Sequence, residues 1–291
     1  TVYVALVLLS GAAVAYALRY YAICPERFIV KIPFTPAGLL ATRAVAAKGV
    51  PVNHTLGFSA RQNYLIARIG RPEFVNVFMG RLNSFVAGND LGDGSYVGEK
   101  ATLASQRTIR GLRDEGRSPS KQIGASLRSG EQIRDLAGLD VLTMPPKAAA
   151  QFLDLGLSAR DVADTVEKAY EPGLDPATDA SAVVLPTLWD VDDSLVACVD
   201  RLEEQDLDGC TAGNLVAFMH DHGCGDLLPR WTDEQVRTSA EEGKIPKLAN
   251  WKDALADGSL GLDSLMNLAG LNSFRADQRD MDEHVAKAMQ G

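Results

Sequence analysis

From Arg27 onward, short apolar runs alternate with longer amphipathic segments, and this alternation restricts the chain to a small set of folds. The apolar runs have the length of buried strands, and five are expected, at Phe28–Ile32, Val52–Leu56, Phe74–Met79, Gln122–Ser126 and Val141–Met144. The segments after them have helical spacing, namely Pro36–Lys48, Ala60–Ile69, Gly98–Asp114, Gly130–Leu136 and Lys147–Leu153. Strands that alternate with helices predict βαβ units and a parallel sheet.

A parallel sheet is either open and doubly wound or closed into a barrel. Nucleotide-binding open sheets carry a glycine-rich turn after the first strand, and the chain has neither a Walker nor a GxGxxG motif. Polar residues recur instead where the expected strands end: Lys31, Asn53, Thr55, Asn76, Ser126 and Arg128. Such strand ends form the active site of a (β/α)8 TIM barrel, which this pattern favours. Because only five of eight strands are expected here, the first three would precede Thr1.

The pattern changes to helices alone after about Leu157. We expect two parts, a partial barrel over residues 1–157 and an all-helical C-terminal region over residues 158–291. The expected helices of the second part are Ser158–Tyr170, a helical stretch from Asp192 to Met219, and a last helix with Phe274, Gln278, Met281 and Val285 on one face.

The segment Val2–Leu18 is almost entirely apolar, which raises the alternative of a membrane anchor. A membrane span needs about 20 such residues, so a buried or interface helix is the preferred interpretation. In a barrel, Val2–Tyr21 would be the helix after the third strand.

Charge and cysteine content restrict the partners and the compartment. The net charge of −9, with lysines and arginines scattered among carboxylates, argues against nucleic acid as a partner. Four cysteines in 291 residues do not form a disulfide framework, and a reducing cytoplasm is the expected location. The oligomeric state stays open, with a homodimer as one option.

Two short motifs suggest metal sites without completing them. Cys210, His220, His222 and Cys224 include zinc-ligating side chains, but no CxxC pair is present and a buried turn is the preferred interpretation. The sequence around Asp206 resembles the start of a calcium loop that lacks its closing glutamate. No metal site is therefore expected.

Lys31 is the candidate nucleophile, because an amine among apolar neighbours at a strand end is desolvated and its pKa falls. Arg81 and Arg128 follow strand ends and could bind a phosphate through paired hydrogen bonds. The neutral polar residues that could bind the hydroxyls of a polyol are Asn53, Thr55, Asn76 and Ser126. The set suits a sugar phosphate. A solvated rim lysine beside ordinary turn formers and helix caps is the alternative.

Several segments resemble the transaldolase family, in the family's order and spacing, between Phe28 and Lys147 and again near the C-terminus. Phe28–Pro33, with Thr35 and Gly38, resembles the segment with the Schiff-base lysine, and Pro51–Ser59 resembles the next pocket-lining segment. Val77–Leu82 and Gly124–Arg128 are similar to the segments that hold the two phosphate-binding arginines. The remaining matches are Leu142–Pro145, similar to the eighth strand, and Phe274–Gln278, similar to the start of the helix that closes the barrel.

The resemblance implies a class I transaldolase of the pentose phosphate pathway. Lys31 would form a Schiff base with a ketose phosphate, such as sedoheptulose 7-phosphate or fructose 6-phosphate, and pass a dihydroxyacetone unit to an aldose phosphate. The iminium polarises the substrate, so no cofactor is implied. Asn76 stands where many family members have serine, which could alter substrate preference.

The family also carries acidic residues on its first and third strands, which would precede Thr1. This chain alone is therefore expected to be weak or inactive, since acid–base assistance is worth about 10² to 10⁴ in rate. The alternatives are a fructose-6-phosphate aldolase, which would release dihydroxyacetone, and a non-catalytic barrel relative.

Overall fold

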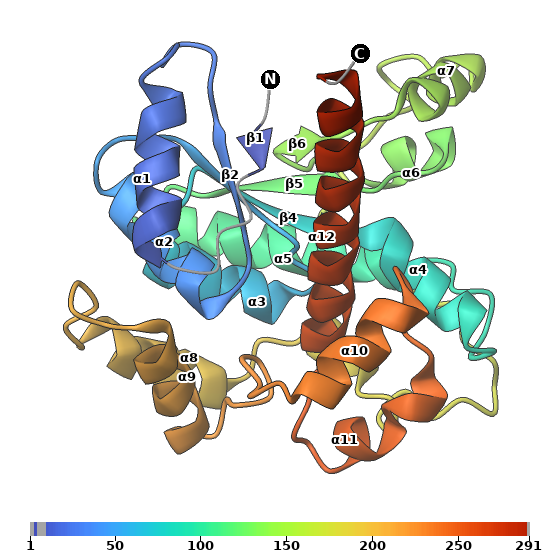
Figure 1. The fold of residues 1–291 in the computed structure, drawn as a ribbon. Coiled ribbons are helices and arrows are strands. Elements are labelled where there is room, and N and C mark those ends of the chain that lie inside the picture. Colours follow the sequence, from blue (N-terminus) through green and yellow to red (C-terminus); the bar gives the residue numbers. More distant parts are fainter. Residues whose placement is uncertain (1–2, 5–9, 290–291) are drawn as a thin grey trace.

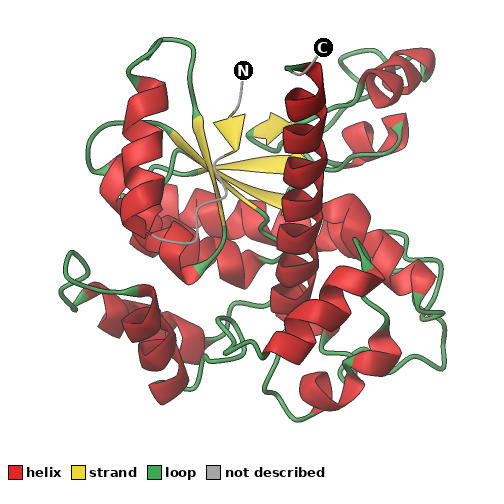
Figure 2. Cartoon of the chain, viewed as in Figure 1, coloured by secondary structure: helices red, strands yellow, loops and turns green. Residues whose placement is uncertain are grey.

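The computed structural model describes residues 3–4 and 10–289, and these form a parallel α/β sheet with helices packed around it (Figures 1 and 2). In the described part of the chain, the strands pair in sequence order, each parallel to the next. They are β1 (Tyr3–Val4), β2 (Val30–Pro33), β3 (Val52–Thr55), β4 (Phe74–Phe78), β5 (Lys121–Ala125) and β6 (Val141–Leu142). A doubly wound sheet reverses its strand order at a switch point, and this sheet does not.

All five expected strands are present, within a few residues of the expected bounds. The expectation of a helix over Val2–Tyr21 is wrong at its start, because Tyr3–Val4 is the strand β1 and pairs with Val30 and Lys31 of β2. The helix α1 begins only at Ser10 and ends at Tyr21. Val2 and residues 5–9 lie outside the described residues.

The helices of the α/β part begin directly after the strands, and side-chain caps explain several of these starts. Thr35, Ser59 and Ser129 each accept a hydrogen bond from a backbone N–H of the first turn that follows. The helices are α2 (Pro36–Ala46), α3 (Ala60–Leu65, continued by a π-helical turn at Ile66–Gly70), α4 (Met79–Gly88), α5 (Val97–Asp114), α6 (Gly130–Asp135) and α7 (Pro146–Asp154).

The C-terminal region is helical, but its first expected helix does not form. Residues 158–170 are turns, because Asp161 accepts hydrogen bonds from the backbone N–H and hydroxyl of Ser158, and Thr165 donates its backbone N–H to Ala137. The helices that do form are α8 (Asp193–Glu203), α9 (Ala212–Asp221), α10 (Asp233–Glu242), α11 (Lys252–Ala256) and α12 (Leu262–Ala288). The closing helix α12 thus begins well before Phe274.

One apolar core joins the two parts of the chain. Val77 and Met79 of the sheet region share a buried cluster with Trp251, Leu265 and Met266. The first turns of α12 are buried from Leu262 to Gly270, and its later turns are mostly exposed. In Figure 1, α12 runs across the sheet as the long red helix.

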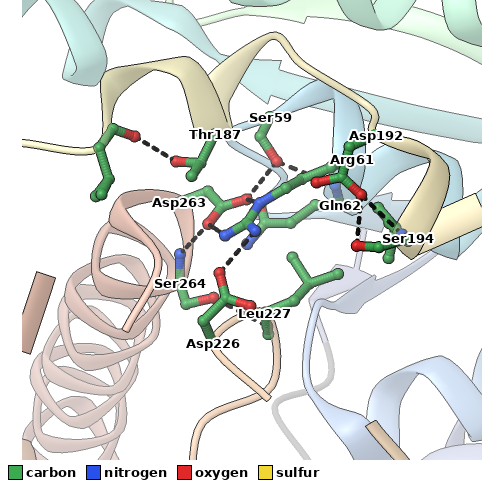
Figure 3. Close-up of polar contacts among 12 residues, drawn as sticks. Ser59, Arg61, Gln62, Thr187, Asp192, Ser194, Asp226, Leu227, Asp263 and Ser264 are labelled. Atoms are coloured by element: carbon green, nitrogen blue, oxygen red, sulfur yellow. Dashed lines mark hydrogen bonds and ion pairs between the residues drawn. The ribbon is translucent and has the colours of Figure 1, made fainter. Parts of the chain in front are cut away.

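A buried ion-pair network holds the start of α12 against the sheet region (Figure 3). Arg61 of α3 binds both carboxylate oxygens of Asp263, at 2.8 and 2.7 Å, and its third nitrogen binds Asp226 at 2.7 Å. The Ser59 hydroxyl also donates to Asp263, at 2.6 Å. The Asp263 side chain is fully buried, so this network connects the first turn of α12 directly to α3.

Among the described residues, no helix is both long enough and apolar enough to cross a lipid bilayer.

Candidate active site

Lys31 lies in β2, in register with Asn53 of the neighbouring strand β3. Its chain neighbours Val30 and Ile32 are buried on the other face of the sheet, against α1 and α2. The Lys31 amine lies 6.0 Å from the centroid of the Phe274 ring of α12. Burial lowers the pKa of the Lys31 ammonium below its ordinary value. Within the described chain, no carboxylate forms a salt bridge with it, so no ion pair offsets the cost of desolvation.

A side-chain hydrogen bond connects two of the expected polyol-binding residues. The amide nitrogen of Asn76 donates to the side-chain oxygen of Asn53 at 2.9 Å and to the backbone oxygen of His54 at 2.9 Å. His54 points away, as its alternation with Asn53 predicted, and its Nδ1 pairs with the Thr42 hydroxyl of α2 at 2.8 Å. Burial lowers the pKa of His54 to about 3, so its imidazole is neutral.

Three buried polar atoms of β3 and β4 lack a hydrogen-bond partner in the described structure: the side-chain oxygen of Asn76, the hydroxyl of Thr55, and Nε2 of His54, which points away from Lys31. Buried polar groups are nearly always satisfied, so unsatisfied ones indicate a place where a polar ligand or water binds. The Asn76 and Thr55 atoms suit the hydroxyls of a polyol.

Arg81 and Arg128 lie close together at the ends of β4 and β5. Burial lowers the pKa of the Arg81 guanidinium, and the neighbouring charge of Arg128 lowers it further, against an opposing effect of Asp277. The Nη1 atom of Arg81 is buried and has no hydrogen-bond partner among the described residues. Arg128 is exposed and donates to the Ser84 hydroxyl at 2.6 Å. Two neighbouring guanidinium groups with free donors form a suitable site for an anion.

Gly80, in the first turn of α4, allows the residues after β5 to pack closely against this helix. A Cβ atom at this position would lie 2.3 Å from the backbone oxygen of Ser126 and 2.7 Å from Nε of Arg128. Ser126 itself is half-buried and has φ of +66°, a left-handed conformation that costs a non-glycine residue about 1–3 kcal/mol. The close packing therefore places Ser126 and Arg128 directly against the start of α4.

The structure thus brings four predicted residues into two direct groups, Asn53 with Asn76 and Arg81 with Arg128. Phe274 and Phe78 connect Lys31 with Arg81 through ring contacts. The Phe274 ring lies 6.0 Å from the Lys31 amine and 6.5 Å from the Phe78 ring, and the Arg81 guanidinium lies 5.6 Å from the Phe78 ring. Neither aromatic residue was among the predicted site residues. In the sequence, the helical spacing of Phe274 with Gln278 and Met281 predicts that these residues share one face of a helix. It does not predict the contact of Phe274 with Lys31.

In the described part of the chain, no three His, Cys, Asp or Glu side chains converge as metal ligands would. His222 stacks on Phe218 and bonds its backbone oxygen at 2.9 Å, and Cys198 contacts Met219. These contacts lie at the end of α9 and in the turn that follows it.

Comparison with known proteins identifies the family of this chain. Residues 9–188 match the family described as transaldolase/fructose-6-phosphate aldolase. A probable transaldolase of Caulobacter sp. (strain K31) is 36% identical over 147 residues, which are 50% of this chain and 59% of the relative. A probable transaldolase of Thermus thermophilus is 33% identical over 155 residues, which are 51% of this chain and 63% of the relative. The chain thus spans about three fifths of the length of these relatives.

The strands, each parallel to the next, and the helices packed around them define a parallel α/β protein. The chain belongs to the transaldolase/fructose-6-phosphate aldolase family.

Proposed function

We propose that this protein is a transaldolase and that Lys31 is its Schiff-base lysine. It would transfer a dihydroxyacetone unit from sedoheptulose 7-phosphate or fructose 6-phosphate to an aldose phosphate, in the cytoplasmic pentose phosphate pathway. The observation that supports this proposal most is the Lys31 amine, which is partly buried, has a lowered pKa and faces the ring of Phe274. Family membership supports the same chemistry.

The reaction needs an amine that is unprotonated at neutral pH. The Lys31 nitrogen adds to the ketose carbonyl, and the resulting carbinolamine takes up one proton on its oxygen and loses water to give an iminium. The hydroxyl next to the breaking carbon–carbon bond loses its proton to solvent and becomes the aldehyde of the released aldose phosphate, while the iminium accepts the electron pair of that bond and becomes an enamine on Lys31. The enamine carbon then attacks the acceptor aldehyde, whose oxygen takes up a proton, and water hydrolyses the product from Lys31.

The other site residues would hold the sugar phosphate during these steps. The unsatisfied atoms of Asn76 and Thr55, together with Asn53 and Ser126, would bind hydroxyl groups. Arg81 and Arg128 would bind the phosphate, which would offset the repulsion between the two guanidinium groups.

Borohydride trapping tests the proposal. The protein is incubated with fructose 6-phosphate, reduced, and analysed by intact mass and peptide mapping. A reduced sugar adduct is expected on Lys31 and is expected to be absent in Lys31→Met. Lys121 is a matched control, because its amine also lies near a ring, 5.9 Å from the centroid of Phe74, but is exposed.

Lys121→Met should retain the adduct. The folded protein without an adduct on Lys31 would contradict the lysine mechanism and favour a non-catalytic role. If the adduct forms, product analysis separates the two activities in the family description: release of free dihydroxyacetone without an acceptor aldose would identify an aldolase in place of a transferase.

A further inference from the structure

A second cavity lies on a different face of α12 from Lys31. It has a volume of about 360 Å³ and lies between α12, α10, the segment before Trp231 and the turn after β2. Its apolar walls include Phe34, Leu228, Trp231, Leu268 and Leu271. None of the proposed catalytic or substrate-binding residues lines it. The volume falls within the range of small-molecule sites.

The helical period separates this cavity from the candidate active site. Gly270, Phe274 and Asp277 recur at spacings of four and three residues and face the sheet, where they approach Arg81 or Lys31. Leu268 and Leu271 belong to another face of the same helix and line the cavity. One helix therefore separates two different environments.

The cavity adjoins a basic hollow. Arg275 and Val236 line both spaces, and the second, of about 440 Å³, is also lined by Arg237 of α10 and Arg279 of α12. The lining of the two spaces contains no aspartate or glutamate among the described residues, although the chain has a net charge of −9. In the same part of the structure, these three arginines form no ion pair.

This grouping of charge is unfavourable without a counter-ion. Arg275 and Arg279 are one helical turn apart on α12, and like charges at this spacing destabilise a helix. Arg237 comes from α10, which packs against α12, and adds a third positive charge to the same hollow. An anion between the arginines would remove the repulsion and gain charge-assisted hydrogen bonds.

Three neutral polar side chains that line the apolar cavity already donate hydrogen bonds within the protein. Asn267 donates to the backbone oxygen of Leu56 at 3.0 Å, and the Ser264 hydroxyl donates to the backbone oxygen of Leu227 at 2.9 Å. Asn272 donates to Ser239 at 3.2 Å. A sugar would lose the hydration of its hydroxyls here without new partners, so the cavity favours an apolar body.

We propose that these adjoining spaces form a binding site for a small amphipathic anion, separate from the Lys31 site. An aromatic or branched apolar body would occupy the cavity beside Trp231 and Leu271. A single carboxylate, sulfonate or phosphate group would pair with Arg275 and Arg237 at its mouth.

Anilinonaphthalene sulfonate is a direct probe, because it joins two apolar ring systems to one sulfonate. Binding is measured by dye fluorescence and stoichiometry by equilibrium dialysis. N-phenylnaphthylamine has the same rings without the sulfonate and reports the apolar contribution alone.

Four variants accompany the two dyes. Arg275→Gln and Arg237→Gln remove the two charges that would pair with the sulfonate. Arg230→Gln is the matched control, because Arg230 is also exposed and lies outside both linings. Ala212→Phe fills the apolar cavity from its edge.

We expect one saturable sulfonate-dye site, weakened about tenfold by either Arg275→Gln or Arg237→Gln, as for the loss of one charge-assisted hydrogen bond. Arg230→Gln should leave the affinity unchanged, and Ala212→Phe should abolish binding of both dyes. Added salt should weaken binding of the sulfonate dye but not of the neutral dye.

The proposal is overturned if no saturable site is found, or if Arg230→Gln weakens binding as much as Arg275→Gln. It is also overturned if both dyes respond equally to the arginine variants. None of these results bears on the Lys31 mechanism, which trapping tests separately.

Discussion

The Lys31 amine lies 6.0 Å from the centroid of the Phe274 ring, although the two residues are separated by most of the chain. The ring covers the amine with an apolar surface and adds only a weak cation–π attraction in return. Removal of water from the amine dominates, which agrees with the direction of the pKa change at Lys31. Phe274 of α12 is thus one of the apolar groups around this lysine, whose burial distinguishes it from an exposed one.

Phe274→Ala should raise the pKa of Lys31 toward its ordinary value, because water would reach the amine. The measurement is the pH dependence of borohydride trapping, whose midpoint should move to higher pH. Loss of the half-buried ring should also cost about 1–2 kcal/mol of unfolding free energy. Phe274→Leu keeps an apolar cover and should shift the midpoint less. An unchanged midpoint in the alanine variant would show that Phe274 does not control the amine.

Lys31→Met should stabilise the fold at neutral pH, because it removes a charge that burial disfavours. In the wild type, the pKa of Lys31 is lower in the folded state than in the unfolded state. Between these two pKa values the unfolded state binds more protons than the folded state, so the free energy of unfolding rises with pH across that range. The methionine variant should lack this rise. Urea unfolding at several pH values below about 10.4, the ordinary lysine pKa, measures the difference. A variant less stable than wild type at pH 7 would contradict the argument.

Asn76→Ala should destabilise the protein by about 1–3 kcal/mol, because the buried oxygens of Asn53 and His54 would lose their donor. Asn76→Asp should cost more, since a carboxylate would face two acceptors. Asn250→Ala, which removes an exposed hydrogen bond to Glu242, should cost less than about 1 kcal/mol. Chemical denaturation of the three variants tests this order, and equal losses at Asn76 and Asn250 would refute it.

Asp263→Ala should cost about 3–5 kcal/mol, because it leaves the buried guanidinium of Arg61 with only Asp226 as a partner. Asp208→Ala is the control. It removes a carboxylate that is 92% exposed and lies 3.8 Å from Arg43, so it should cost less than about 1 kcal/mol. Protection of α12 amides from hydrogen exchange should fall in Asp263→Ala alone. Unchanged protection would show that this network does not hold α12.

Gly80→Ala should destabilise the fold by about 1–3 kcal/mol and weaken phosphate binding, because its Cβ would overlap the backbone of Ser126 and the side chain of Arg128. Gly111→Ala is the matched comparison. It lies inside α5, its Cβ would meet no atom within 4 Å, and the change should stabilise the helix by up to about 1 kcal/mol. Thermal melts and titration with inorganic phosphate distinguish the two, and a neutral Gly80→Ala would show that the strand ends are loosely packed.

The alternation of apolar and amphipathic segments was enough to predict the parallel sheet and most of its helices, because period and turn residues are local. The strand β1 was missed because Tyr3–Val4 is too short to be recognised inside a longer apolar run. The helix α4 was missed because it starts at Met79 with no cap or break after β4. The helix expected at Ser158–Tyr170 was wrong because side-chain turns at Asp161 replaced helical hydrogen bonds.

Only those features of the candidate site that depend on neighbouring residues in the sequence could be predicted. The placement of Lys31 in a strand and the alternation of Asn53 with His54 follow from local sequence and strand geometry, although β2 continues past Lys31 to Pro33. The bond between Asn76 and Asn53 depends on strand register, and the contact of Lys31 with Phe274 depends on where α12 packs. Pairs such as Arg61 with Asp263 leave no trace in local sequence.

The anchor between Arg61 and Asp263 joins residues 202 positions apart. During synthesis, every strand of the described sheet emerges before α12 does, so Arg61 and Lys31 remain exposed to water until the ribosome has made almost all of the described chain. Docking of the last helix adds the Phe274 ring to the surroundings of the amine, so reactivity at Lys31 would report the completion of folding.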